Sequence, residues 1–371
     1  MNNPFKRNVG LDALRILSMY FVLILHILLA GGILDSVPFL SSNYRAAWFL
    51  EIFAFCAVNC YALISGYVGY KANHNFSKLI MLYLQVAFYT IITTILYCYL
   101  NSSFSIVDSI RFAVLPFTSD QLWYVKAYFI LFLLMPILDT VVEKTIQFRL
   151  GPILFIGLVV IFSILPCVFD IVVIPTKNGY SWIWISVLYI VGAICKHYNF
   201  QKYVKSYLLL ALYFVCNLVA FNFKIASESL MNRPVTDIYA DIRYIAPTIL
   251  FASLALFFLF LKIKVPAKLH QIIESVAPTT FSVYIIHMCP LIYSTFISNR
   301  FIHLIELATP LFILSVLACA ALIFCSCSII DMIRIEIFNE LEIRTTIINT
   351  VNKTTNSMKL LLRNISDKRN K

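Results

Sequence analysis

One apolar stretch near the N-terminus carries two ionisable side chains at a spacing suited to chemistry. Arg15 and His26 both lie in the run from Leu11 to Leu34. Eleven steps of about 100° end about 20° from the starting direction, so a helix places both side chains on one face, about 16 Å apart along its axis. Ionisable groups inside a membrane-length helix are costly, so each of these two needs a function or a partner.

The two side chains suit different parts of a group-transfer reaction. The planar guanidinium of Arg15 can make paired, charge-assisted hydrogen bonds to a phosphate or pyrophosphate. Asp12 lies one helical turn earlier and can hold that guanidinium in place. A neutral imidazole at His26 can take a proton from a hydroxyl group. Two plainer interpretations stay open: Arg15 reaches toward lipid headgroups, and His26 forms a hydrogen bond between helices.

The composition is that of an integral membrane protein. Of 371 residues, 61% are hydrophobic and 13% are charged, whereas soluble proteins carry about 25% charged residues. The net charge of +11 does not indicate nucleic-acid binding, because basic residues in such a chain line cytoplasmic loops and meet anionic lipid. Almost all of the ten cysteines lie in apolar runs, so we interpret them as small side chains at helix interfaces.

The hydrophobic runs predict an all-α, polytopic fold with about ten transmembrane helices, since each run approaches or exceeds the roughly 18 residues that a spanning helix needs. An amphipathic stretch at residues 101–121 is expected to lie at the membrane interface. The ten predicted spans are residues 11–34, 46–70, 77–100, 122–142, 151–174, 181–195, 206–223, 242–261, 279–298 and 307–330.

The distribution of basic residues predicts the orientation of the chain. If the N-terminus is cytoplasmic, most of the 29 Lys and Arg residues fall on the cytoplasmic side, as in most membrane proteins. We therefore expect both termini in the cytoplasm. Residues 1–330 form the predicted membrane domain, and residues 331–371 form a basic cytoplasmic tail.

Six further polar or aromatic residues inside the predicted helices are candidates for the walls of a site. Packing between helices also accounts for the polar residues of the second helix, and an aromatic belt at the membrane interface also accounts for the pair that opens the fourth. The candidates are Asn59 and Ser65 in the second helix, Gln85 in the third, Trp123 and Tyr124 in the fourth and the buried His287 in the ninth.

Taken in order, these segments resemble the membrane acyltransferase-3 family of bacteria. Arg15 and His26 match the family's first-helix signature of an arginine and a histidine with ten residues between them. Positions 60 and 61 are Cys and Tyr, where a larger apolar residue and Phe are common in the family. Similar elements follow in the family's order. They are a segment with Ser-Gly near its end at residues 58–67, Leu-Trp-aromatic at 122–128, Tyr-x-x-Gly at 189–192 and Tyr-x-x-His at 284–287.

The resemblance implies a multi-pass enzyme of the bacterial cytoplasmic (inner) membrane. Such an enzyme moves an acyl group, acetyl in the first instance, from cytoplasmic acyl-CoA to a sugar hydroxyl of a cell-envelope or exopolysaccharide glycan or of its lipid-linked precursor. The resemblance implies no bound cofactor. Acetyl-CoA takes part as the donor substrate. In this interpretation His26 is the general base and Arg15 the cation near the CoA phosphates or the thioester. Substrate binding or stabilisation of an oxyanion then falls to Asp12, Asn59, Ser65, Gln85, Trp123, Tyr124 and His287.

A transporter of a glycan or lipid-linked saccharide is the alternative, because buried polar groups among many helices also suit a permeation path. The sequence shows no internal repeat, which favours the enzyme. A purely structural scaffold does not explain a buried arginine and two buried histidines. Within the enzyme interpretation, direct transfer is simpler than an acyl-enzyme on Ser65. No acidic partner that would orient His26 is evident in the sequence.

Reporter fusions test the predicted topology. A fusion at Lys71 should give a cytoplasmic signal and a fusion at Lys177 an extracytoplasmic one, because an odd number of predicted spans separates the two loops. Paired fluorescent and alkaline phosphatase reporters, active on opposite sides of the membrane, measure this. The same signal at both positions would contradict the predicted spans between them.

Overall fold

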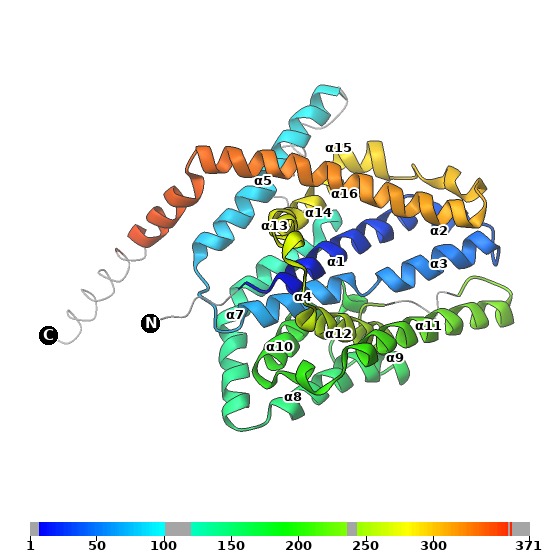
Figure 1. Cartoon of the computed structure of the whole chain (residues 1–371), viewed down its shortest axis with the longest axis horizontal. Helices are drawn as coiled ribbons and strands as arrows, with labels where there is room; N and C mark the ends of the chain where they lie inside the picture. The colour runs from blue at the N-terminus through cyan, green and yellow to red at the C-terminus, as the bar shows by residue number, and fades with distance from the viewer. Residues whose placement is uncertain (1–6, 101–119, 236–242, 355–356, 358–371) are drawn as a thin grey trace.

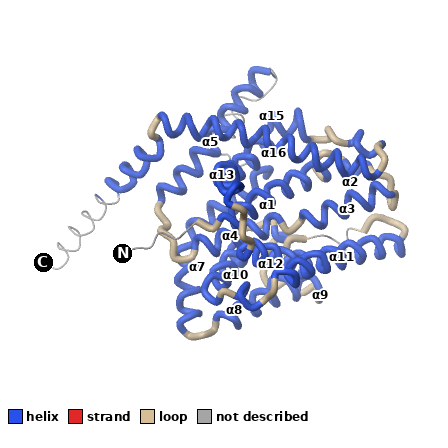
Figure 2. The backbone as a smooth tube through the Cα atoms, viewed as in Figure 1, coloured by secondary structure: helices blue, strands red, loops and turns tan. Residues whose placement is uncertain are grey.

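The computed structural model consists of helices joined by loops and turns over the described ranges, which are residues 7–100, 120–235, 243–354 and 357 (Figures 1 and 2). No strand occurs in those ranges, so the predicted all-α class is confirmed. The α-helices are α1 (Val9–Leu28), α2 (Ile33–Ser36), α3 (Ser42–Ala54), α4 (Ala57–Gly69), α5 (Phe76–Leu100), α7 (Trp123–Gln147), α8 (Gly151–Val159), α9 (Leu165–Val168), α10 (Trp182–Tyr198), α11 (Ser206–Met231), α12 (Pro247–Lys262), α13 (Ala267–Val276), α14 (Thr280–Met288), α15 (Pro290–Ile292) and α16 (Thr309–Glu340).

Helix α1 lies at the centre of the bundle (Figure 1), where α3, α4, α12, α13, α14 and α16 all contact it. It begins after Asn8, whose side chain accepts a hydrogen bond from the Leu11 backbone N–H at 3.2 Å. The acidic Asp12 lies in its first turn, where it complements the helix dipole. Because helices surround α1, its polar side chains can contact other helices and are not limited to contact with lipid.

Seven candidate spans among the described residues are long and apolar enough to cross a membrane. A bent helix pair at Ala267–Met288 and Pro290–Glu306 makes an eighth if it counts as one span. The sixth and eighth predicted spans correspond to the shorter apolar helices α10 and α12. The chain is thus a multi-pass membrane protein, with seven or eight spans by length among the described residues, and the count of ten stays a prediction.

The predicted ninth span, residues 279–298, is wrong as a single helix. Helix α14 ends at Met288, and the chain bends by 64° before it continues from Pro290. Cys289 is extended, with φ −63° and ψ 140°, because the ring of a following proline disfavours the helical conformation. The bend places the C-terminal end of α14, which carries His287, inside the bundle.

Helices α4 and α10 approach most closely at two glycines. A Cβ atom on Gly66 would lie 2.0 Å from the backbone oxygen of Tyr189, and one on Gly192 would lie 2.3 Å from that of Leu63. Only glycine permits such an approach. The packing role considered for Ser65-Gly66 is therefore confirmed for Gly66. The contact also joins two elements of the family pattern, the Ser-Gly element and the Tyr-x-x-Gly element.

Helix α16 continues through residue 331, the predicted start of the cytoplasmic tail. Asp331 and Arg334 form a buried ion pair there, with Nε and Oδ1 2.6 Å apart, and the Tyr89 hydroxyl donates to the same carboxylate at 2.6 Å. About three turns of the predicted tail thus belong to the bundle. The predicted interfacial stretch 101–121, except its last two residues, and most of the tail after residue 354 lie outside the described residues.

Two alanine substitutions test the α4–α10 contact. Gly66→Ala should lower the free energy of unfolding by about 1–3 kcal/mol, because the new methyl group meets a backbone carbonyl that cannot move aside. Gly157→Ala on α8 is the matched control, since nothing lies within 4 Å of its Cβ position. Melting temperatures of the purified variants in detergent measure the difference. Equal melting temperatures would contradict the close contact.

Candidate active site

A pocket inside the bundle is lined by His26 and by a ring of apolar and aromatic side chains. Helix α1 forms one wall, and α4, α7, α14 and the segment before α12 form the others. Such a lining excludes water and strengthens electrostatic interactions inside the pocket. The other lining residues are Met19, Val22, Leu25, Val58, Tyr61, Trp123, Tyr124, Tyr244, Phe281 and Tyr284.

His26 is paired with a second imidazole. Its Nδ1 atom lies 2.7 Å from Nε2 of His287, and Nδ1 of His287 lies 2.5 Å from the carbonyl oxygen of Val283. His287 is fully buried, whereas His26 reaches the pocket. The structure therefore brings together two residues predicted from the sequence, one on α1 and one on α14. It also supplies the partner for His26 that the sequence did not show, and this partner is an imidazole and not a carboxylate.

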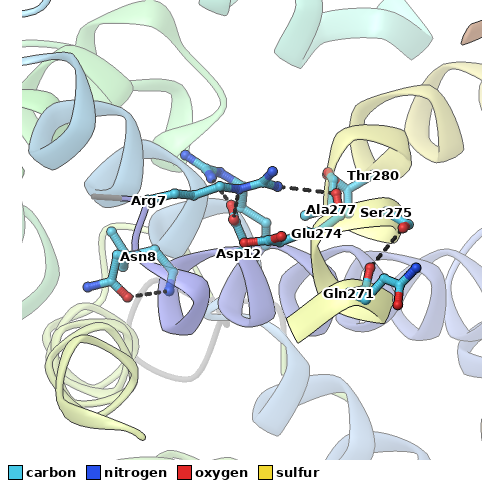
Figure 3. Close-up of polar contacts among 10 residues, drawn as sticks. Arg7, Asn8, Asp12, Gln271, Glu274, Ser275, Ala277 and Thr280 are labelled. Atoms are coloured by element: carbon cyan, nitrogen blue, oxygen red, sulfur yellow. Dashed lines mark hydrogen bonds and ion pairs between the residues drawn. The ribbon is translucent and has the colours of Figure 1, made fainter. Parts of the chain in front are cut away.

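Asp12 joins two arginines at the start of α1. One carboxylate oxygen accepts a hydrogen bond from Arg15 and the other accepts one from Arg7. Arg7 also donates to the backbone oxygen of Glu274 at 3.3 Å, which ties the start of α1 to α13 (Figure 3). Asp12 is 2% exposed, whereas the Arg15 side chain is 29% exposed. Asp12 thus holds the guanidinium as predicted, and Arg15 keeps an accessible face.

Tyr61 links Arg15 to the pocket. Its ring lines the pocket, and its hydroxyl donates to the backbone oxygen of Arg15 at 2.8 Å. Arg15 itself does not line the pocket. The imidazole therefore lies at the pocket and the cation outside it, and Tyr61 contacts both the pocket and the backbone at Arg15.

Asn59 supports the pocket from behind. Its amide nitrogen donates to the backbone oxygen of Tyr244 at 2.8 Å, and its amide oxygen accepts from the indole N–H of Trp184 at 2.9 Å. Asn59 and Trp184 are almost completely buried. The side chain does not line the pocket but fixes Tyr244, which does.

Ser65 and Gln85 also lie outside the pocket lining. The Ser65 hydroxyl donates to the backbone oxygen of Tyr61 at 2.9 Å, one turn earlier on α4. The Gln85 amide donates to the Ser282 hydroxyl at 2.6 Å and so connects α5 to α14. These contacts place both residues next to elements that carry pocket or histidine side chains.

Trp123 and Tyr124 both line the pocket, as the sequence predicted for site walls. The Trp123 ring lies 5.0 Å from Tyr180 and 6.2 Å from Tyr244, centroid to centroid. Tyr124 is buried among other aromatic rings. Tyr244 and Phe281 were not predicted, because a chain with 21 Tyr and 31 Phe offers no signal that separates pocket aromatics from core aromatics.

The chain belongs to the acyltransferase-3 family. The family model described as an acyltransferase domain matches residues 8–330, from the cap of α1 into α16. No curated protein and no solved structure matches the chain. Together with the apolar helices, the family match identifies a multi-pass membrane acyltransferase.

Substitution of Asn59 tests the support of the pocket wall. Asn59→Ala leaves the Trp184 indole N–H and the Tyr244 carbonyl unpaired, and each buried group without a partner costs about 1–3 kcal/mol. Asn222→Ala is the matched control, because Asn222 is exposed and its amide bonds only to the Leu218 carbonyl of its own helix. Thermal unfolding in detergent should show a clear loss for the first variant and almost none for the second. Equal losses would contradict this assignment.

Proposed function

We propose that the protein transfers an acyl group, acetyl in the first instance, from acyl-CoA to a hydroxyl of a cell-envelope or exopolysaccharide glycan or of its lipid-linked precursor. It works in the bacterial cytoplasmic membrane, with both termini and the donor on the cytoplasmic side. One observation carries the proposal. His26 lines an aromatic pocket while its Nδ1 atom is turned to His287, so Nε2 is the ring nitrogen left for a substrate.

The reaction runs as a direct transfer with His26 as the base. The acceptor hydroxyl gives its proton to Nε2 of His26 while its oxygen attacks the thioester carbonyl carbon. The tetrahedral intermediate then collapses, the carbon–sulfur bond breaks, and the thiolate takes the proton back from the imidazolium. The products are an ester and free CoA thiol, and the enzyme returns to its starting protonation state. We assign no nucleophilic role to Ser65, because it lies outside the pocket lining and its hydroxyl donates back to its own helix.

The donor lies along α1, with its phosphates at the Arg15 end and its acyl group at His26. The two positions are about 16 Å apart along the helix, which suits the long pantetheine arm between pyrophosphate and thioester. Arg7 and Arg15 share the carboxylate of Asp12, so two guanidinium groups lie here as possible donors to an anionic ligand.

The developing oxyanion needs a hydrogen-bond donor inside the pocket. The hydroxyls of Tyr61 and Tyr284 donate to the backbone oxygens of Arg15 and Gln121. The Tyr124 hydroxyl makes no hydrogen bond within the part of the chain that the structure describes, and its ring lines the pocket. We assign the oxyanion contact to Tyr124 in preference to Asn59 and Gln85, whose amides bond elsewhere.

Reconstitution tests the proposed activity. Purified protein in liposomes, supplied with radiolabelled acetyl-CoA and a panel of envelope glycans, should label one glycan and release one free thiol for each ester formed. Glycan that crosses the sealed bilayer without any thiol release would overturn the enzyme assignment and favour the transporter.

Two variants separate chemistry from donor binding. His26→Ala should lower kcat by about 10²–10⁴-fold, the usual effect of losing a general base, and leave the affinity for acetyl-CoA measurable. Arg15→Ala should weaken acetyl-CoA binding by about ten- to a hundredfold, since a hydrogen bond to a charged group is worth about 1.5–3 kcal/mol. Arg344→Ala, at an exposed arginine far along the chain, is the control. Steady-state kinetics and equilibrium binding measure both effects, and normal turnover in both variants would contradict the site.

A further inference from the structure

The two histidines form a chain of hydrogen bonds whose direction is set at one end. A carbonyl oxygen only accepts, so the contact of 2.5 Å between Val283 and Nδ1 of His287 requires a hydrogen on that nitrogen. In a neutral ring, Nε2 of His287 is then an acceptor. His26, whose Nδ1 lies 2.7 Å away, must therefore donate from Nδ1. A neutral His26 with its hydrogen on Nδ1 has a free lone pair on Nε2.

The surroundings keep both rings neutral. His287 is fully buried, and its ring neighbours are His26 and Tyr284. Among the described residues, no carboxylate forms an ion pair with either ring. A charged imidazole in such a place lacks both water and a counter-ion, which is costly. The alternative, a doubly protonated His287 that donates to His26, is therefore disfavoured.

We infer that His287 is a positioning residue that fixes His26 in the tautomer whose Nε2 can act as the base. This inference rests on the proposed role of His26. It replaces the expectation that His287 stabilises an oxyanion, because both of its ring nitrogens bond within the protein and its side chain does not line the pocket.

Helix α14 holds His287 in this role. The bond to Val283 lies within one helical turn, so the helix itself sets the ring orientation. Two long-range bonds hold α14 in place: Gln85 donates to Ser282, and the Tyr284 hydroxyl donates to the Gln121 carbonyl at 2.9 Å. The helix ends at Met288, one residue after His287, and the next residue, Cys289, is extended.

A neutral partner also suits a thiolate leaving group. When His26 takes the acceptor proton, its Nδ1 hydrogen continues to point at the lone pair of His287. A carboxylate in that place would stabilise the imidazolium more and hold the proton more strongly. A thiol has a pKa of about 8.5, so its thiolate leaves readily and recovers the proton from a weakly held imidazolium. The histidine pair therefore matches transfer from a thioester.

Two substitutions at His287 test the positioning role. His287→Gln keeps an acceptor for the Nδ1 hydrogen of His26, whereas His287→Leu removes it. We expect His287→Leu to lower kcat by about 10²–10⁴-fold, as the wrong tautomer does in a triad enzyme, with KM for acetyl-CoA unchanged. His287→Gln should stay within about tenfold of wild type in kcat. His270→Leu, at a histidine that bonds only to the Val265 carbonyl outside the pocket, is the control.

The ¹⁵N spectrum of histidine-labelled protein reads the tautomer directly. The chain has six histidines, and the His26→Ala spectrum assigns the His26 signals. Wild-type His26 should show a hydrogen-bearing Nδ1 and a bare Nε2, and His287→Leu should show mixed tautomers. A bare Nδ1 in the wild type, or equal loss of activity in the Gln and Leu variants, would overturn the inference. The spectrum needs no substrate, so it decides the tautomer even if wild-type protein transfers no acyl group, which would contradict the proposed function instead.

Discussion

The cost of polar side chains inside an apolar bundle is the constraint on which this structure depends. A buried polar group without a partner in the protein is costly, because lipid offers none. Helix α1 meets this need at both ends, with Asp12 between two arginines and His26 against His287. Arg15 belongs to α1 itself, whereas Arg7 precedes the helix and His287 belongs to α14, so these contacts tie α1 both to the segment before it and to a neighbouring helix.

The same pairings make the two ends of α1 chemically different. Its first turns present a cation with an accessible face, and its last turns present an imidazole to a pocket that excludes water. A long anionic donor with a reactive end fits that order. The family match makes the chain an acyltransferase. In the proposed reaction, one helix would serve both the phosphates and the acyl group of the donor.

Local rules were enough to predict some parts of the site. The spacing of Arg15 and His26, the bond from Asp12 to Arg15 and the close contact at Gly66 each follow from helix geometry or residue size. The pairing of His26 with His287 does not, because 261 positions separate them and no local pattern states which helices are neighbours.

Other differences between expectation and structure have physical causes as well. Asn59 was expected to line the site, but its amide instead bonds to Tyr244 and Trp184 behind the pocket. The sequence shows that a buried amide needs hydrogen-bond partners, but it does not show which residues they are. The predicted ninth helix ran through Pro290, although the residue before a proline seldom stays helical. Gln85 sits on α5 as expected, yet its amide faces Ser282 and not the pocket.

The position of the donor along α1 can be measured in a structure of the protein with an unreactive acetyl-CoA analogue, in which an ether replaces the thioester. We predict that the phosphates contact Arg15 and that the carbon in place of the acyl group lies in the pocket beside Nε2 of His26. An analogue that binds away from α1, or one whose acyl end stays outside the pocket, would contradict it.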